Sequence, residues 1–248
     1  MKIVIVGSGS KGNAVLICSK NTLIQIDMGV PLKRVDEALS LLNKKRSDIK
    51  AIFITHEHTD HVGTLKLYHD QIPIFASEGT IEEADYLVAP FSPIPIGDFN
   101  IVPFSVSHDA ANPMGYLLEA DNQRLGYVTD TGFLSDDDLL LLRDCDFYYF
   151  ESNHDLKMLR ESNRPAILKR RIHSKHGHLS NPASAKYMAK LIGPRTKQIL
   201  LAHLSEECNT PEIALKSYRE TLLEKKIDLT GIEIIPAAQW EITQGGEK

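Results

Sequence analysis

The 248-residue sequence has few cysteines and no long apolar run. Cys18, Cys145 and Cys208 are odd in number and lack CxxC spacing, which argues against a disulfide framework and favours reduced thiols. The opening apolar run ends at Val6, too early for a signal peptide, and no stretch approaches the roughly 18 apolar residues of a membrane span. We therefore expect a cytoplasmic protein without membrane segments.

Positive charge is also scarce. Lysine and arginine total 28 against 33 aspartate and glutamate residues, and the resulting net charge of −5 excludes a general attraction to nucleic acid or to anionic membranes. A local basic patch remains open. Hydrophobic residues make up 42% of the chain, which is enough for a core, and neither repeats nor low-complexity tracts divide it. We predict one domain over residues 1–248.

The first glycine-rich stretch, Gly7-Ser-Gly-Ser-Lys-Gly12, follows an apolar strand and matches the dinucleotide-binding pattern GxGxxG, with Asp27 at the expected distance. That pattern requires a helix after its last glycine, because the helix N-terminus holds the pyrophosphate. Two short β-like runs joined by a turn follow instead, so no helix fits between Gly12 and Leu23. We reject a dinucleotide site and interpret the loop as a turn between strands.

Strand and helix patterns alternate along the rest of the chain, which indicates sheets covered by helices. The predicted strands are Ala51–Ile54, Ile72–Phe75, Phe99–Val106, Tyr116–Glu119, Arg124–Val128, Phe147–Phe150, Gln198–Leu201 and Ile232–Ile235. The predicted helices are Pro31–Asn43, Asp136–Arg143, Pro165–Arg171, Pro182–Leu191 and Pro211–Lys225. We interpret the proline-rich segment Ala89–Gly97 as a surface connection.

A histidine-rich motif follows the predicted strand Ala51–Ile54. It contains His56, His58, Asp60 and His61. Burying so many polar side chains at the end of a strand costs free energy unless a ligand binds them. Imidazole nitrogens and carboxylate oxygens suit borderline divalent cations, and several such ligands can serve two ions. A solvated histidine-rich turn is the alternative. This HxHxDH pattern resembles the signature of metallo-β-lactamase-fold hydrolases.

The later sequence also resembles that family. His108 follows a predicted strand, Asp130 resembles the bridging aspartate, and His203 resembles the last ligand. Asp27 resembles the structural aspartate. The resemblance spans nearly the whole chain and implies an α/β fold, the αββα sandwich, with the metal site at one edge of the two sheets.

The resemblance implies two divalent metal ions per chain. Zinc is the expected metal, and manganese or iron stays open because the same donors accept them. Two such ions can hold a bridging hydroxide at neutral pH, which implies hydrolysis. The implied ligands are His56, His58 and His108 for the first ion, Asp60, His61 and His203 for the second, and Asp130 between them.

The segment around His178 points to a phosphodiester substrate. It precedes a predicted helix and resembles the segment in which phosphodiesterase members carry a histidine that contacts the scissile phosphate. A histidine can act as an acid near neutral pH, so His178 joins Asp60 as a candidate catalytic residue. Ser180 or Asn181 would cap the helix, whose N-terminus favours an anion. The alternative is that His178 only shapes the loop.

A basic run lies just upstream of His178. Lys169, Arg170, Arg171 and Lys175 either form the solvated face of a helix or follow a nucleic-acid backbone, in which case they bind substrate together with Ser180. The other polar candidates are weaker. His154 is an ambiguous site residue, His173 and His176 are weak candidates, and Glu57 and His69 are expected at the surface.

The intervals between the motifs leave no room for the cap domain of β-CASP nucleases or for the exosite arm of the tRNA-processing enzymes. The sequence resembles instead the compact bacterial YycJ-like branch, which is associated with 5′-to-3′ exonuclease activity on DNA. The segments that carry this resemblance are Ser8–Asn13, Ser107–Asn112, Phe150–His154 and Ala202–Glu206. Three hypotheses remain: an exonuclease using a metal-bridging hydroxide, a phosphodiesterase or other ester hydrolase for small molecules, and a non-catalytic metal-binding regulator.

Overall fold

The computed structural model describes residues 1–67 and 72–247, so His69 lies outside the described residues. The chain forms two compact units. The first unit combines Met1–Ser105 and Ala110–Gln123 with the C-terminal segment from Ala238, and the second combines Val106–Asp109 with Arg124–Ala237. One domain over the whole chain stays a prediction. No helix within the described residues has the length and apolar character that crossing a membrane requires.

The first unit contains a mixed sheet in the order β14-β1-β2-β3-β4-β5-β6. Its strands are β1 (Lys2–Gly7), β2 (Ala14–Cys18), β3 (Leu23–Ile26), β4 (Ile49–Phe53), β5 (Ile74–Ser77), β6 (Tyr86–Val88) and β14 (Thr243–Gly246). From β3 to β6 the strands run parallel, so their carboxyl ends meet at one edge. Helix α1 (Leu32–Leu41), close to the predicted bounds, connects β3 to β4 and buries Val35, Ala38 and Leu39 at helical spacing.

The first unit also contains an antiparallel ribbon of β7 (Ile94–Ile96), β8 (Phe99–Ser105) and β9 (Met114–Ala120). The proline-rich segment lies at the surface as expected, but its residues Ile94–Ile96 form the strand β7 rather than an irregular connection. This strand lies at a sheet edge, where Pro95 can be accommodated without an N–H donor. Tyr116 of β9 donates a hydrogen bond of 2.6 Å to the carbonyl of Ile54, which ties the ribbon to the chain just after β4.

The second unit is built on parallel strands in the order β10-β11-β12-β13. The strands are β10 (Gln123–Val128), β11 (Phe147–Glu151), β12 (Gln198–Ala202) and β13 (Glu233–Pro236). Strand β11 is buried along its whole length, and its sequence is aromatic up to the final Glu151. Parallel neighbours need crossover connections, and helices supply them here.

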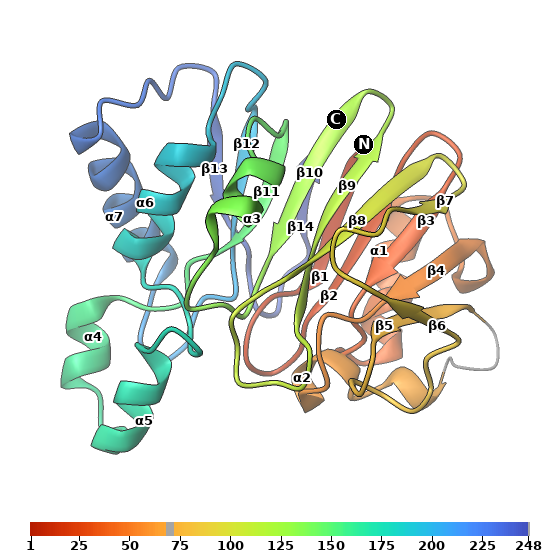
Figure 1. Ribbon diagram of the computed structural model, residues 1–248, viewed down its shortest axis with the longest axis horizontal. Coiled ribbons are helices and arrows are strands. Elements are labelled where there is room, and N and C mark those ends of the chain that lie inside the picture. Colours follow the sequence, from red (N-terminus) through yellow and green to blue (C-terminus); the bar gives the residue numbers. More distant parts are fainter. Residues whose placement is uncertain (68–71, 248) are drawn as a thin grey trace. The chain divides into compact units, whose positions relative to one another are not determined.

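The crossover helices of the second unit are α3 (Asp136–Leu141), α6 (Asn181–Leu191) and α7 (Pro211–Glu224), and α6 and α7 lie side by side (Figure 1). Between β11 and α6 the chain adds α4 (Leu156–Glu161) and α5 (Ala166–Ile172). The periodicity did not predict α4, which is short. Its start is fixed by the Asp155 carboxylate, which accepts hydrogen bonds from two backbone amides of the first turn.

Candidate metal centre

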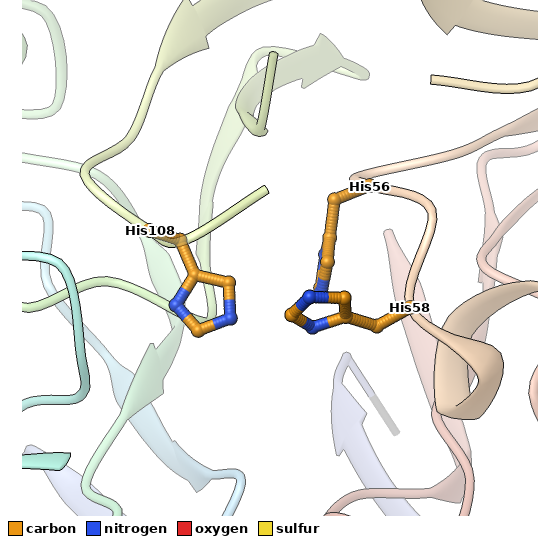
Figure 2. A group of neighbouring side chains, drawn as sticks. All are labelled: His56, His58 and His108. Atoms are coloured by element: carbon orange, nitrogen blue, oxygen red, sulfur yellow. The ribbon is translucent and has the colours of Figure 1, made fainter. Parts of the chain in front are cut away.

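The histidine motif of the first unit lies at the carboxyl end of β4. His56 and His61 are buried, while His58 and Asp60 are half-buried. The ring centroid of His56 lies 4.5 Å from that of His58 and 4.0 Å from that of His61. The short helix α2 (Thr59–Val62) carries Asp60 and His61. Figure 2 shows His56 and His58 on this segment, together with His108, which follows β8.

Asp27 orients this motif from the end of β3. Its carboxylate accepts a 2.8 Å hydrogen bond from the Thr55 amide and another of 2.8 Å from Nδ1 of His61. Burial raises the pKa of Asp27, although His61 and Thr55 oppose the shift. Because Nδ1 of His61 donates to Asp27, Nε2 carries the lone pair that a metal ion would use. These contacts give Asp27 a supporting position, and the structural role that the resemblance implies stays a prediction.

The glycine-rich opening loop is a turn between β1 and β2, as expected, and it supports the same motif. The Asn13 amide nitrogen lies 3.2 Å from Oδ2 of Asp60 and 3.0 Å from Nε2 of His61. The backbone of Asn13 also donates a 2.7 Å hydrogen bond to the Asp60 carbonyl. A side chain at Gly29 would place its Cβ only 1.6 Å from that carbonyl, so this close approach requires glycine.

The second unit brings its own predicted site residues together around Asp130. Oδ1 of Asp130 lies 3.3 Å from Nδ1 of His203, 3.7 Å from Nδ1 of His178 and 3.9 Å from Nε2 of His108. Asp130 follows β10 and His203 follows β12, and both have left-handed backbone conformations with φ of 51° and 54°. Such conformations are unfavourable for residues other than glycine and often occur at functional sites.

Sequence reasoning missed Glu151, the last residue of β11. Its Oε1 lies 2.8 Å from Nδ1 of His178 and 3.1 Å from Nδ1 of His203. Its Oε2 accepts hydrogen bonds from the amides of Thr131, at 3.0 Å, and Leu179, at 3.1 Å. Burial alone would raise its pKa, but the two histidines lower the pKa of Glu151 to about 2. An acid directly after the apolar run of a parallel strand was the signal available in the sequence.

These donors fit a divalent metal ion. Asp130, Glu151, His178 and His203 each offer a ligand atom, and these atoms lie within 4.8 Å of one another. Burial lowers the pKa of His108, and the charges of Asp130 and Glu151 only partly oppose this. The lowered pKa favours the neutral imidazole, the form that binds metals. Nitrogen and oxygen donors of this type suit zinc, manganese or iron.

The four residues of the basic run differ in their contacts and exposure. The Lys169 ammonium donates to the carbonyls of Arg160, at 2.7 Å, and Ser162, at 2.6 Å. Arg171 forms an ion pair with Asp109. Arg170 and Lys175 are exposed. Ser180 caps α6, as the sequence predicted, by accepting a hydrogen bond from the amide at position 183.

The remaining polar candidates differ in their surroundings. Glu57 is half-buried rather than outward-facing, because its carboxylate accepts a 2.9 Å hydrogen bond from the Ala111 amide. His154 is fully buried, and within the described chain neither ring nitrogen has a hydrogen-bond partner. Burial lowers the pKa of His154 to about 4. His173 and His176 are exposed.

Buried imidazoles and carboxylates at the carboxyl ends of strands are the donor set of a metal-binding protein. The family described as "Beta-lactamase superfamily domain" matches residues 26–204. The chain belongs to this superfamily and has the metallo-β-lactamase fold, which confirms the predicted α/β architecture and the αββα sandwich.

Named relatives confirm the resemblance to the YycJ-like branch. "Exodeoxyribonuclease YycJ" of Bacillus anthracis is 35% identical over 235 residues, which cover 89% of this chain and 89% of that protein. "Exodeoxyribonuclease WalJ" of Streptococcus pneumoniae strain D39 is 37% identical over 229 residues, with coverage of 86% and 85%. The crystal structure of the metallo-β-lactamase fold protein YhfI from Bacillus subtilis has a TM-score of 0.71 at 15% identity and covers 98% of this chain and 99% of that chain.

Proposed function

We propose that the protein is a dinuclear metal-dependent nuclease and acts as a 5′-to-3′ DNA exonuclease. One observation carries this proposal: the half-buried His178 is hydrogen-bonded to the buried Glu151 and lies 3.7 Å from Asp130. A histidine held in this way can donate a proton to the leaving oxygen of a phosphodiester next to the candidate metal ligands. The relatives named exodeoxyribonuclease support DNA as the substrate.

Histidine and aspartate side chains would hold the metal ions. We assign the ligands as the family resemblance implies: His56, His58 and His108 for one ion, Asp60, His61 and His203 for the other, and Asp130 between them. When bound, two such ions would lower the pKa of water and stabilise negative charge on the attacking and leaving oxygens. Zinc is the proposed metal, since histidine-rich sites with a few carboxylates suit it.

The side chains of this protein would supply orientation and protons. Asp27, Thr55 and Glu151 hold the imidazoles in place. The half-buried Asp60 would accept a hydrogen bond from the attacking water. As the P–O ester bond breaks, His178 would donate its proton to the leaving oxygen, and Glu151 would stabilise the imidazolium before that transfer.

The proposed activity is tested by incubating metal-loaded protein with DNA and RNA labelled at the 5′ or 3′ end, in parallel with bis-p-nitrophenyl phosphate. We expect early release of label from 5′-labelled DNA, slower release from 3′-labelled DNA, and no activity after treatment with EDTA. Hydrolysis of the small phosphodiester alone would contradict the nuclease proposal. No hydrolysis of any substrate would favour a non-catalytic metal-binding regulator.

One observation favours a small-molecule phosphodiesterase as the second candidate. Two of the four cations in the basic run, Lys169 and Arg171, already bind oxygen atoms of the protein itself. They therefore offer less charge to a polyanion than the sequence indicated. A small phosphodiester needs no extended basic track.

The salt dependence of DNA binding should distinguish Arg170 and Lys175 from Lys169 and Arg171. We expect Arg170→Gln with Lys175→Gln to weaken binding and to reduce the slope of log K against log salt by about 0.7–0.9 for each lost phosphate contact. The matched pair Lys169→Gln with Arg171→Gln removes the same formal charge and should change the slope less, because both side chains already bind oxygen atoms of the protein. Fluorescence anisotropy with a labelled oligonucleotide measures both. Equal slopes for wild type and the first pair would support the small-molecule candidate.

A further inference from the structure

We propose, on the basis of the nuclease function above, that Phe133 provides the surface on which an unpaired nucleobase of the substrate strand stacks. Phe133 follows closely after Asp130 at the carboxyl end of β10. Its side chain is 40% exposed although the neighbouring site residues are polar and mostly buried. Single exposed apolar side chains are common on proteins, so the proposal depends on how this one is held.

The backbone that carries Phe133 is fixed at three points. The Thr131 amide donates a 3.0 Å hydrogen bond to Glu151, and the Thr131 hydroxyl donates one of 2.7 Å to the Phe133 carbonyl. The Gly132 amide donates a 3.0 Å hydrogen bond to the Ser107 carbonyl, next to His108. The backbone under the ring therefore belongs to the same turn that joins Glu151 to the His108 segment, and this fixed backbone limits the entropy lost when a ligand binds.

The loop that leads to His178 packs against this turn and adds a positive charge. A Cβ at Gly132 would lie 2.2 Å from the Ser174 carbonyl oxygen and 2.6 Å from that of Lys175, so only glycine permits this contact. The Lys175 ammonium lies over the Phe133 ring, 5.2 Å from its centroid. An aromatic ring and a cation are thus placed together beside the proposed proton donor.

This pairing matches the chemistry of a single DNA strand. Proteins that bind single strands combine aromatic side chains, on which bases stack, with cations that follow the phosphates. Stacking tolerates any base, as an exonuclease requires. A base inside a duplex is already stacked on both faces, so the geometry points to a preference for an unpaired end, with Lys175 next to the phosphate of the stacked nucleotide.

The test combines Phe133 variants with abasic DNA. We expect Phe133→Ala to raise KM for single-stranded DNA roughly 10- to 100-fold with a much smaller change in kcat, and Phe133→Trp to restore KM. For the wild type, one abasic nucleotide near the scissile phosphate should raise KM by a similar factor. The Phe133→Ala variant should no longer distinguish intact from abasic DNA at that position. Phe91→Ala removes a phenylalanine of the first unit that is 51% exposed and serves as the control.

The outcomes separate this inference from the function on which it rests. Two results would overturn the stacking inference alone, provided that the wild type hydrolyses single-stranded DNA. One is an unchanged KM for Phe133→Ala, and the other is a Phe133→Ala variant whose KM rises on abasic DNA as much as that of the wild type. If the wild type hydrolyses no DNA, the proposed function fails and the inference fails with it. An equal rise in KM for Phe91→Ala would also count against a specific role of Phe133.

Discussion

Replacing Asp130 with alanine is expected to abolish metal binding and hydrolysis together. The Asp130 carboxylate lies within 3.9 Å of ring nitrogens of His108, His178 and His203, and we propose that it bridges two cations. In its absence, no negative ligand would offset the repulsion between the two cations. Elemental analysis of the purified protein should show two metal ions per chain for the wild type and little or none for Asp130→Ala.

The exposed Asp137, in the first turn of α3, provides the matched control. Asp137→Ala removes the same chemical group from the same unit and should retain metal content and activity. Circular dichroism of both variants distinguishes loss of metal from loss of fold. A fully active wild type with a single tightly bound metal would argue against the dinuclear mechanism, and full activity of Asp130→Ala would exclude Asp130 as the bridge.

The second large effect is expected for His178→Ala. This variant should keep its metal and its thermal stability but lose turnover of DNA by about 10²–10⁴-fold, the usual range for general acid–base assistance. Glu151 would retain contacts with His203, Thr131 and Leu179, so the local structure should persist. Metal analysis, thermal melting and single-turnover kinetics measure the three properties separately.

The leaving group provides the internal control for His178. p-Nitrophenolate needs little protonation, so hydrolysis of bis-p-nitrophenyl phosphate should decrease much less than hydrolysis of DNA. Equal losses on both substrates would assign His178 a role other than proton donation. Loss of metal would make it a ligand, consistent with its grouping with Asp130, Glu151 and His203. Unchanged turnover would leave it a residue that only shapes the loop.

The sequence by itself determined the fold class and the main set of candidate ligands. The motif from His56 to His61 is local, because its donors are close in the chain and follow a strand with a clear apolar pattern. His108, Asp130 and His203 could be assigned because each follows a predicted strand and the set occurs in the order that the resemblance demands. These predictions depended on the chemistry and periodicity that short segments carry, together with the family resemblance.

The tertiary structure decided which distant groups support those candidates. Glu151 acquires its position because β11 pairs in parallel with β10 and β12, a register that aligns Phe150 with Val128 and Leu201. The sequence shows an acid after an apolar run, but it does not show that this acid contacts His178 and His203. Likewise, the sequence shows the charges of Lys169 and Arg171 but not their internal partners. Residue type and periodicity are local properties, whereas pairing across a sheet or between loops depends on packing of segments far apart in the chain.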